Sequence, residues 1–165
     1  MNAKDLIINQ IEAGMWLFSE FTKDFSDEDA KFQPFDGGNH LNWILVHVAT
    51  TQDSIISVVG NTPKQISDTL HKNYGGSSQC KADDGMTKAE AWKLFTETHA
   101  RAVEFVNNFD ESKYSQPAPE GSPPMFKTTG EFLGLLGTHS FWHFGQLSVN
   151  RRMLKKPMVL GNQAD

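Results

Sequence analysis

Residues 137–154, GTHSFWHFGQLSVNRRML, contain a pair of histidines within a largely apolar segment. His139 and His143 stand four residues apart among aromatic residues. Four residues make about one helical turn, so in a helix both imidazoles project from the same face, with Cβ atoms about 5–6 Å apart. An imidazole pair on an otherwise apolar face is either hydrogen-bonded within a core or holds a ligand.

Apolar residues that recur every three or four positions predict four helices. The first shows this pattern from Ile7 to Phe25, and the second spans about residues 41–59. The third and fourth open with capping-box patterns, TKAE at 87–90 and TTGE at 128–131, and the fourth runs to about Leu154. Long connections lie between them, at residues 26–39, 61–86 and 110–127. No segment alternates convincingly with a period of two, so the predicted fold class is all-α: a four-helix bundle with long interhelical connections, in a single domain over residues 1–165.

The ends of the second helix are predicted from its flanking residues. Asn39, in the sequence DGGN, is the expected N-cap, and Gly60 is the expected stop. His40 beside the helix start and His71 in the next connection are expected to be solvated.

Composition restricts the partners and the compartment. The net charge of -5 argues against a nucleic-acid partner, since phosphates attract a positive surface. No apolar run approaches the roughly 20 residues of a membrane span, and no signal-peptide pattern opens the chain, so no membrane partner is expected. Cys80 is the single cysteine and cannot form an internal disulfide, which favours a reducing, cytoplasmic location.

The spacing of His139 and His143 is that of an H-x-x-x-H metal-binding pair on a helix. The intervening residues are Ser-Phe-Trp, so the general-base glutamate of the zinc-protease motif is absent. Two histidines leave a metal undercoordinated, and His47, on the apolar face of the second helix, offers a third ligand. If the second and last helices pack together, the three imidazoles can share one ion; if no metal binds, all three are packed core residues.

Two more residues belong to this hypothesis. Gln146 lies about one turn beyond His143 and is a candidate to hydrogen-bond a metal-bound water or thiol, or a ligand imidazole; a bond to another helix is the alternative. His99 lies on the apolar stripe of the third helix. We expect His99 to be a packed residue, with a fourth ligand or a pocket residue as the alternatives.

These two blocks of sequence, NWILVHVA and HSFWHFGQLSVNRR, resemble the DinB/YfiT-like metalloprotein superfamily. The family signature is a histidine early in the second helix and an H-x-x-x-H followed by Gly-Gln and a basic residue on the last helix. The resemblance implies a DinB-like four-helix bundle that binds a divalent metal ion, commonly nickel or zinc. It places the three metal ligands on His47, His139 and His143 of this chain.

The resemblance implies less about the reaction. Some relatives transfer low-molecular-weight thiols, some isomerise with a thiol cofactor, and many have no known activity. The preferred hypothesis is a metal-dependent, thiol-dependent S-transferase that acts on a small-molecule substrate. The alternatives are a metal-dependent hydrolase, a non-catalytic metal-binding or stress protein, and a helical interaction module without metal. No catalytic residue is assigned, and the oligomeric state stays open, with a homodimer as one option.

Overall fold

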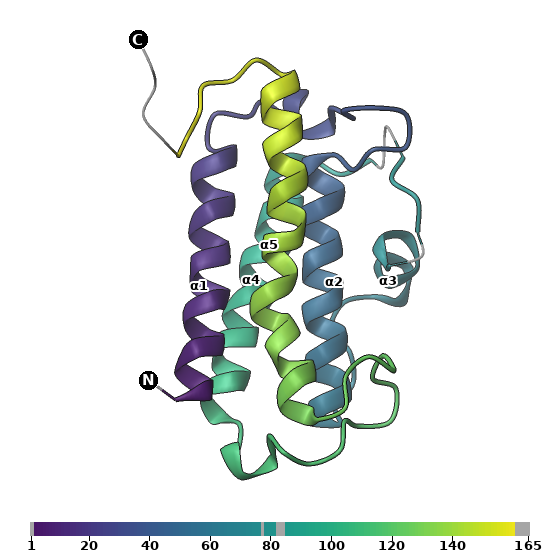
Figure 1. Cartoon of the computed structure of the whole chain (residues 1–165). Helices are drawn as coiled ribbons and strands as arrows, with labels where there is room; N and C mark the ends of the chain where they lie inside the picture. Colours follow the sequence, from purple (N-terminus) through teal and green to yellow (C-terminus); the bar gives the residue numbers. More distant parts are fainter. Residues whose placement is uncertain (1, 77, 82–84, 161–165) are drawn as a thin grey trace.

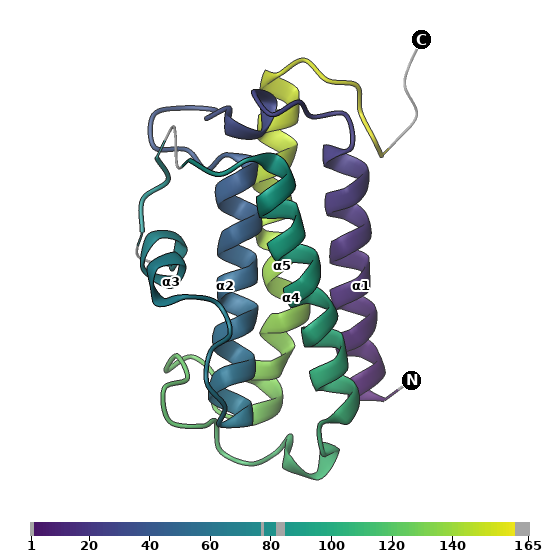
Figure 2. The ribbon, with the colours of Figure 1, turned by 180° about the vertical axis from the view of Figure 1, so that it is seen from behind.

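The computed structural model describes residues 2–76, 78–81 and 85–160. Four long helices run side by side: α1 (Ala3–Thr22), α2 (Leu41–Gly60), α4 (Lys88–Asn108) and α5 (Thr129–Met153) (Figure 1). A short helix, α3 (Asp68–Tyr74), lies outside this bundle against α2, as the view from behind also shows (Figure 2). Two 3-10 turns, η1 (Asp29–Lys31) and η2 (Glu111–Lys113), lie in the connections. The predicted all-α four-helix bundle is therefore confirmed, with α3 as an element that the periodicity did not reveal.

The helix starts follow from side-chain caps. The predicted capping boxes are present on α4, with Thr87 and Glu90, and on α5, with Thr128 and Glu131. The predicted cap of α2 is wrong: His40, not Asn39, is the N-cap, because its ring nitrogen accepts the backbone N–H of Trp43 at 3.1 Å. Here an imidazole nitrogen accepts the hydrogen bond that a side-chain oxygen usually accepts at an N-cap.

Packing within the bundle places α1 against α4 and α5, and α2 against α4 and α5. The contact between α2 and α5, which a shared ion requires, is thus present. The core has two parts. One cluster surrounds Phe18, Phe95 and Leu147, and the other surrounds Ile11, Val106 and Leu133. In the described residues no helix is long and apolar enough to cross a membrane.

Two glycines set how closely α1 and α5 approach. A Cβ on Gly137 would lie 2.6 Å from the Cβ of Gln10, and one on Gly14 would lie 2.9 Å from the Cβ of Ser140. Both distances are shorter than carbon atoms tolerate, so the helix axes would have to separate. Gly137 also lies two residues before His139, so this contact fixes the part of α5 that carries the histidine pair.

A pair of glycine substitutions tests this contact. Gly137→Ala is expected to lower the free energy of unfolding by about 1–3 kcal/mol, because the added methyl group overpacks the α1–α5 interface. Gly134→Ala on the same helix is the matched control, since a Cβ there meets nothing within 4 Å. That control is expected to stabilise the chain by about 0.5–1 kcal/mol through helix propensity. Equal stabilities of the two variants in urea unfolding would contradict the account.

Candidate metal centre

Three imidazoles converge where α2 faces α5. His47 comes from α2, and His139 and His143 come from successive turns of α5. One ligand nitrogen from each ring lies within 4.8 Å of the other two, and all three side chains are buried. The structure therefore brings together all three predicted ligands, while their binding of a metal stays a prediction.

The spacing of the nitrogens suits a single ion. Nε2 of His139 lies 3.1 Å from Nε2 of His143. Two ligand nitrogens at about 2.0–2.1 Å from a tetrahedral zinc ion lie about 3.3–3.4 Å apart, close to this separation. Two unprotonated nitrogens that face each other repel through their lone pairs, so the arrangement is favourable only with a proton or a cation between them.

Burial keeps these imidazoles neutral. The loss of solvent lowers the pKa of His139 to about 3 and that of His143 to about 4, and it also lowers the pKa of His47. The neighbouring imidazoles act in the same direction on His139 and His143, because two positive charges repel. Neutral imidazole is the form that ligates metals, so the three side chains are in the ligating state at neutral pH.

Hydrogen bonds fix the tautomer of two of the rings. Nδ1–H of His47 donates to the backbone carbonyl of Tyr74 at 2.6 Å. Nδ1–H of His143 donates to Oε1 of Gln146 at 3.0 Å, and the amide of Asn39 donates to the same oxygen. A protonated Nδ1 leaves Nε2 with a free lone pair for a metal. Gln146 thus contacts a ligand imidazole, one of the roles considered for it. Nδ1 of His139 is buried without a hydrogen-bond partner among the described residues.

Aromatic side chains wall the three histidines. Trp43 stacks on His47, with ring centroids 4.6 Å apart and planes 10° from parallel. The rings of Trp142 and His139 lie nearly perpendicular to each other, with centroids 5.7 Å apart. These rings limit the access of water, and a lower local dielectric strengthens the electrostatic effect of any bound cation.

The remaining histidines lie apart from this cluster. His99 is buried on α4, where its loss of solvent lowers its pKa to about 4 and the amide of Gln52 lies 3.5 Å from its Nδ1. Within the part of the chain that the structure describes, neither His99 nor any carboxylate or cysteine joins the three imidazoles. His99 is therefore a packed residue, as expected.

The expectation that His40 and His71 are solvated is wrong. His40 is fully buried, where it caps α2 and its other ring nitrogen donates to the carbonyl of Lys81 at 2.9 Å. His71 belongs to α3 and lies 2.9 Å from the carboxylate of Asp53. Neither role could be predicted from the sequence, because Lys81 and Asp53, the partners of His40 and His71, are far from them along the chain.

A cavity lies between α2 and α5 beside the histidines. Its volume is about 200 Å³. Thr50 and Thr51 on its wall lie one turn beyond His47, and Leu135 lies one turn before His139. None of the three clustered histidines lines this cavity. Its other walls include hydroxyl, imidazole and apolar groups from α2, α3, the residues just after α3, the connection before α5, and α5: Ser54, Ile55, Val58, His71, Gly75, Gly76, Gly121, Pro123 and Phe132.

Comparison with known proteins places the chain among relatives of the same architecture. The structure of a conserved protein from Enterococcus faecalis superposes with a TM-score of 0.67 at 18% identity, over 94% of this chain and 98% of that one. At this identity the likeness shows the fold alone. No curated protein matches the chain. The DinB superfamily profile matches residues 10–147, a span that includes all of α2 and α4, most of α1 and α5, and the three converging histidines. The chain belongs to the DinB superfamily.

Proposed function

We propose that this chain binds one divalent metal ion through His47, His139 and His143 and acts as a metal-dependent enzyme on small molecules. The observation that carries the proposal is the convergence of three buried, neutral imidazoles without a fourth protein ligand among the described residues. Catalytic sites commonly use three protein ligands and leave a position for water or substrate, whereas structural zinc sites use four.

The preferred reaction is the transfer of a low-molecular-weight thiol to an electrophilic small molecule. A divalent ion, nickel or zinc, would supply Lewis acidity that lowers the pKa of a thiol at its free position. The chain's own part is to hold His47 and His143 each in one tautomer, through Tyr74 and Gln146, and to limit water with Trp43. The cavity beside Thr50 offers space for a small substrate about one helical turn from the centre.

Metal-dependent hydrolysis is the second candidate, and a specific observation favours it. The wall of the cavity between α2 and α5 carries the Ser54 hydroxyl and the His71 imidazole, whose nearest polar atoms are 3.4 Å apart. His71 is in turn held by Asp53. An imidazole so placed can accept a proton from water, which supplies a base that the helix faces of the three ligands lack.

We also propose that the protein works in a reducing compartment such as the cytoplasm. The support is Cys80, the single cysteine in the sequence, which is buried and cannot form an internal disulfide. Low-molecular-weight thiols are kept reduced in such a compartment, so the proposed co-substrate would be available there.

Substitution of single histidines tests the ligand set. His47→Ala, His139→Ala and His143→Ala are each expected to lose most of the zinc or nickel that the wild type retains after reconstitution and dialysis, because two imidazoles hold an ion far more weakly than three. His99→Gln, which alters a buried imidazole outside the cluster, is the matched control and is expected to keep its metal. Elemental analysis measures the content, and circular dichroism checks the fold. Full metal retention in all three alanine variants would refute the proposal.

Cobalt substitution tests the open position and the preferred reaction. A small thiol such as 2-mercaptoethanol is expected to produce sulfur-to-cobalt charge-transfer absorption in the Co²⁺ protein. Transfer of that thiol to a reactive halide such as monobromobimane is expected to accelerate only when protein and metal are both present. Absence of the absorption band, with cobalt bound, would exclude the transferase and favour hydrolysis or plain metal binding.

A further inference from the structure

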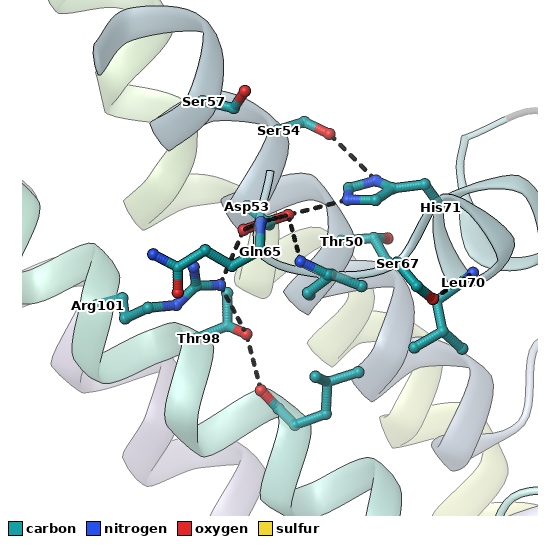
Figure 3. Close-up of polar contacts among 12 residues, drawn as sticks. Thr50, Asp53, Ser54, Ser57, Gln65, Ser67, Leu70, His71, Thr98 and Arg101 are labelled. Carbon is teal, nitrogen blue, oxygen red and sulfur yellow. Dashed lines mark hydrogen bonds and ion pairs between the residues drawn. The ribbon is translucent and has the colours of Figure 1, made fainter. Parts of the chain in front are cut away.

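Asp53 is a buried carboxylate at the centre of a polar network that links α2, α3 and α4 (Figure 3). It lies on α2, six residues after His47. Its oxygens accept the backbone N–H groups of Gln65 and Ile66 at 3.1 Å, together with Nε2–H of His71 and Nη2–H of Arg101, both at 2.9 Å. A buried charge is costly unless it is paired and hydrogen-bonded, and these donors satisfy that requirement.

Hydrogen bonds of this network join three segments of the chain to α2. Gln65 and Ile66 belong to the connection that follows α2, His71 belongs to α3, and Arg101 belongs to α4. These interactions hold the pKa of Asp53 below its usual value despite its burial, so the carboxylate is charged at neutral pH. The tie between Asp53 and His71 is therefore a charge-assisted hydrogen bond.

α3 depends on such ties for its position. It has seven residues, which is too short for a helix to be stable without tertiary contacts. Ser67 caps its first turn, Leu70 packs at the margin of the core, and Tyr74 is buried at its end. The side chain of His71 is 11% exposed, so its bond to Asp53 is sheltered from water.

The end of α3 reaches the histidine cluster. The carbonyl oxygen of Tyr74, three residues after His71, accepts Nδ1–H of His47 at 2.6 Å. The hydrogen bonds between α2 and α3 thus include Asp53 to His71 and His47 to Tyr74, besides the weaker contact of Ser54 with His71. The hydrogen bond between Asp53 and His71 holds α3 in place. The carbonyl of Tyr74, at the end of α3, then accepts the hydrogen bond from His47.

We propose that Asp53 and His71 are positioning residues of the metal centre. Their hydrogen bond keeps α3 where the Tyr74 carbonyl holds the proton of His47 on Nδ1, and so keeps Nε2 of His47 free to bind the ion. This inference rests on the proposed metal-binding function, but the tautomer of His47 can be measured in the metal-free protein. Arg101 extends the same support to α4, on the far side of Asp53.

The first experiment determines the tautomer of His47 in metal-free protein by long-range ¹H–¹⁵N correlation NMR. The wild type is expected to carry the proton on Nδ1. In His71→Ala the two tautomers are expected to be mixed, because the Tyr74 carbonyl is no longer held against the ring. His71→Gln is expected to restore the wild-type tautomer, since the glutamine amide nitrogen takes the place of Nε2 and can donate to Asp53.

Two further variants separate this role from general stability. Thr69→Ala changes an exposed residue of the same helix and is expected to match the wild type. His71→Asn places its amide nitrogen near the position of Nδ1, beside Ser54, and is expected to behave like His71→Ala. The asparagine variant retains a polar side chain and replaces His71→Ala in the test if the alanine variant does not fold.

The second experiment measures zinc affinity by competition with a chromophoric chelator. His71→Ala is expected to bind zinc about 10–100-fold more weakly than the wild type, the usual effect of losing a group that orients a metal ligand. His71→Gln and Thr69→Ala are expected to stay close to the wild type. If His71→Gln loses affinity as much as His71→Ala does, the hydrogen bond is not the cause and the inference is overturned.

The two readouts fail in different ways. An unchanged His47 tautomer in both His71→Ala and His71→Asn would overturn the positioning role, whatever the protein does with zinc. Absence of zinc binding in every variant, wild type included, would refute the metal-binding function, while the NMR data would still decide whether His71 orients His47.

Discussion

The contact between α2 and α5 is the constraint on which the rest of the candidate site depends. It buries three imidazoles against one another, and burial of polar groups is costly unless they are paired. His47 and His143 each satisfy one nitrogen through a neighbouring oxygen, which directs the other nitrogen into the cluster. The nitrogens that meet there have no complementary donor except a proton or a cation. The proposed metal ion would satisfy the nitrogens that meet there.

Other parts of the fold serve this contact from outside. The close approach of α1 at Gly137 fixes α5 just before its histidine pair. α2 carries both His47 and the buried Asp53, so one helix supplies a predicted ligand and a carboxylate that holds α3. Tyr74 completes the link with a backbone carbonyl. The short helix outside the bundle is thus connected to the candidate centre through the His47–Tyr74 hydrogen bond, and to α2 and α4 through Asp53 and Arg101.

The sequence contains enough information to predict the bundle, the three histidines and Gln146 as a candidate partner of a ligand imidazole, but not what orients His47. The pair at 139 and 143 is visible because helical spacing places both on one face. The apolar face of the second helix offers His47 as the third ligand, and the family resemblance supports that choice. The role of Tyr74 is not visible, because a backbone carbonyl leaves no signature in the side chains. His71 and Asp53 are 18 residues apart across a connection with no regular period, so their pairing depends on tertiary structure. The burial of His40 also depends on tertiary structure, because its partner Lys81 follows α2 and α3 in the chain.

X-ray absorption spectroscopy of the zinc-loaded protein tests the central claim most directly, because it counts the ligands around the ion without the need for a substrate. The account predicts three imidazole nitrogens at about 2.0–2.1 Å and a remaining position filled by an oxygen from solvent. In the presence of a small thiol, that oxygen should be replaced by one sulfur at about 2.3 Å. A shell closed by four protein ligands, or one with fewer than three imidazoles, would contradict the account.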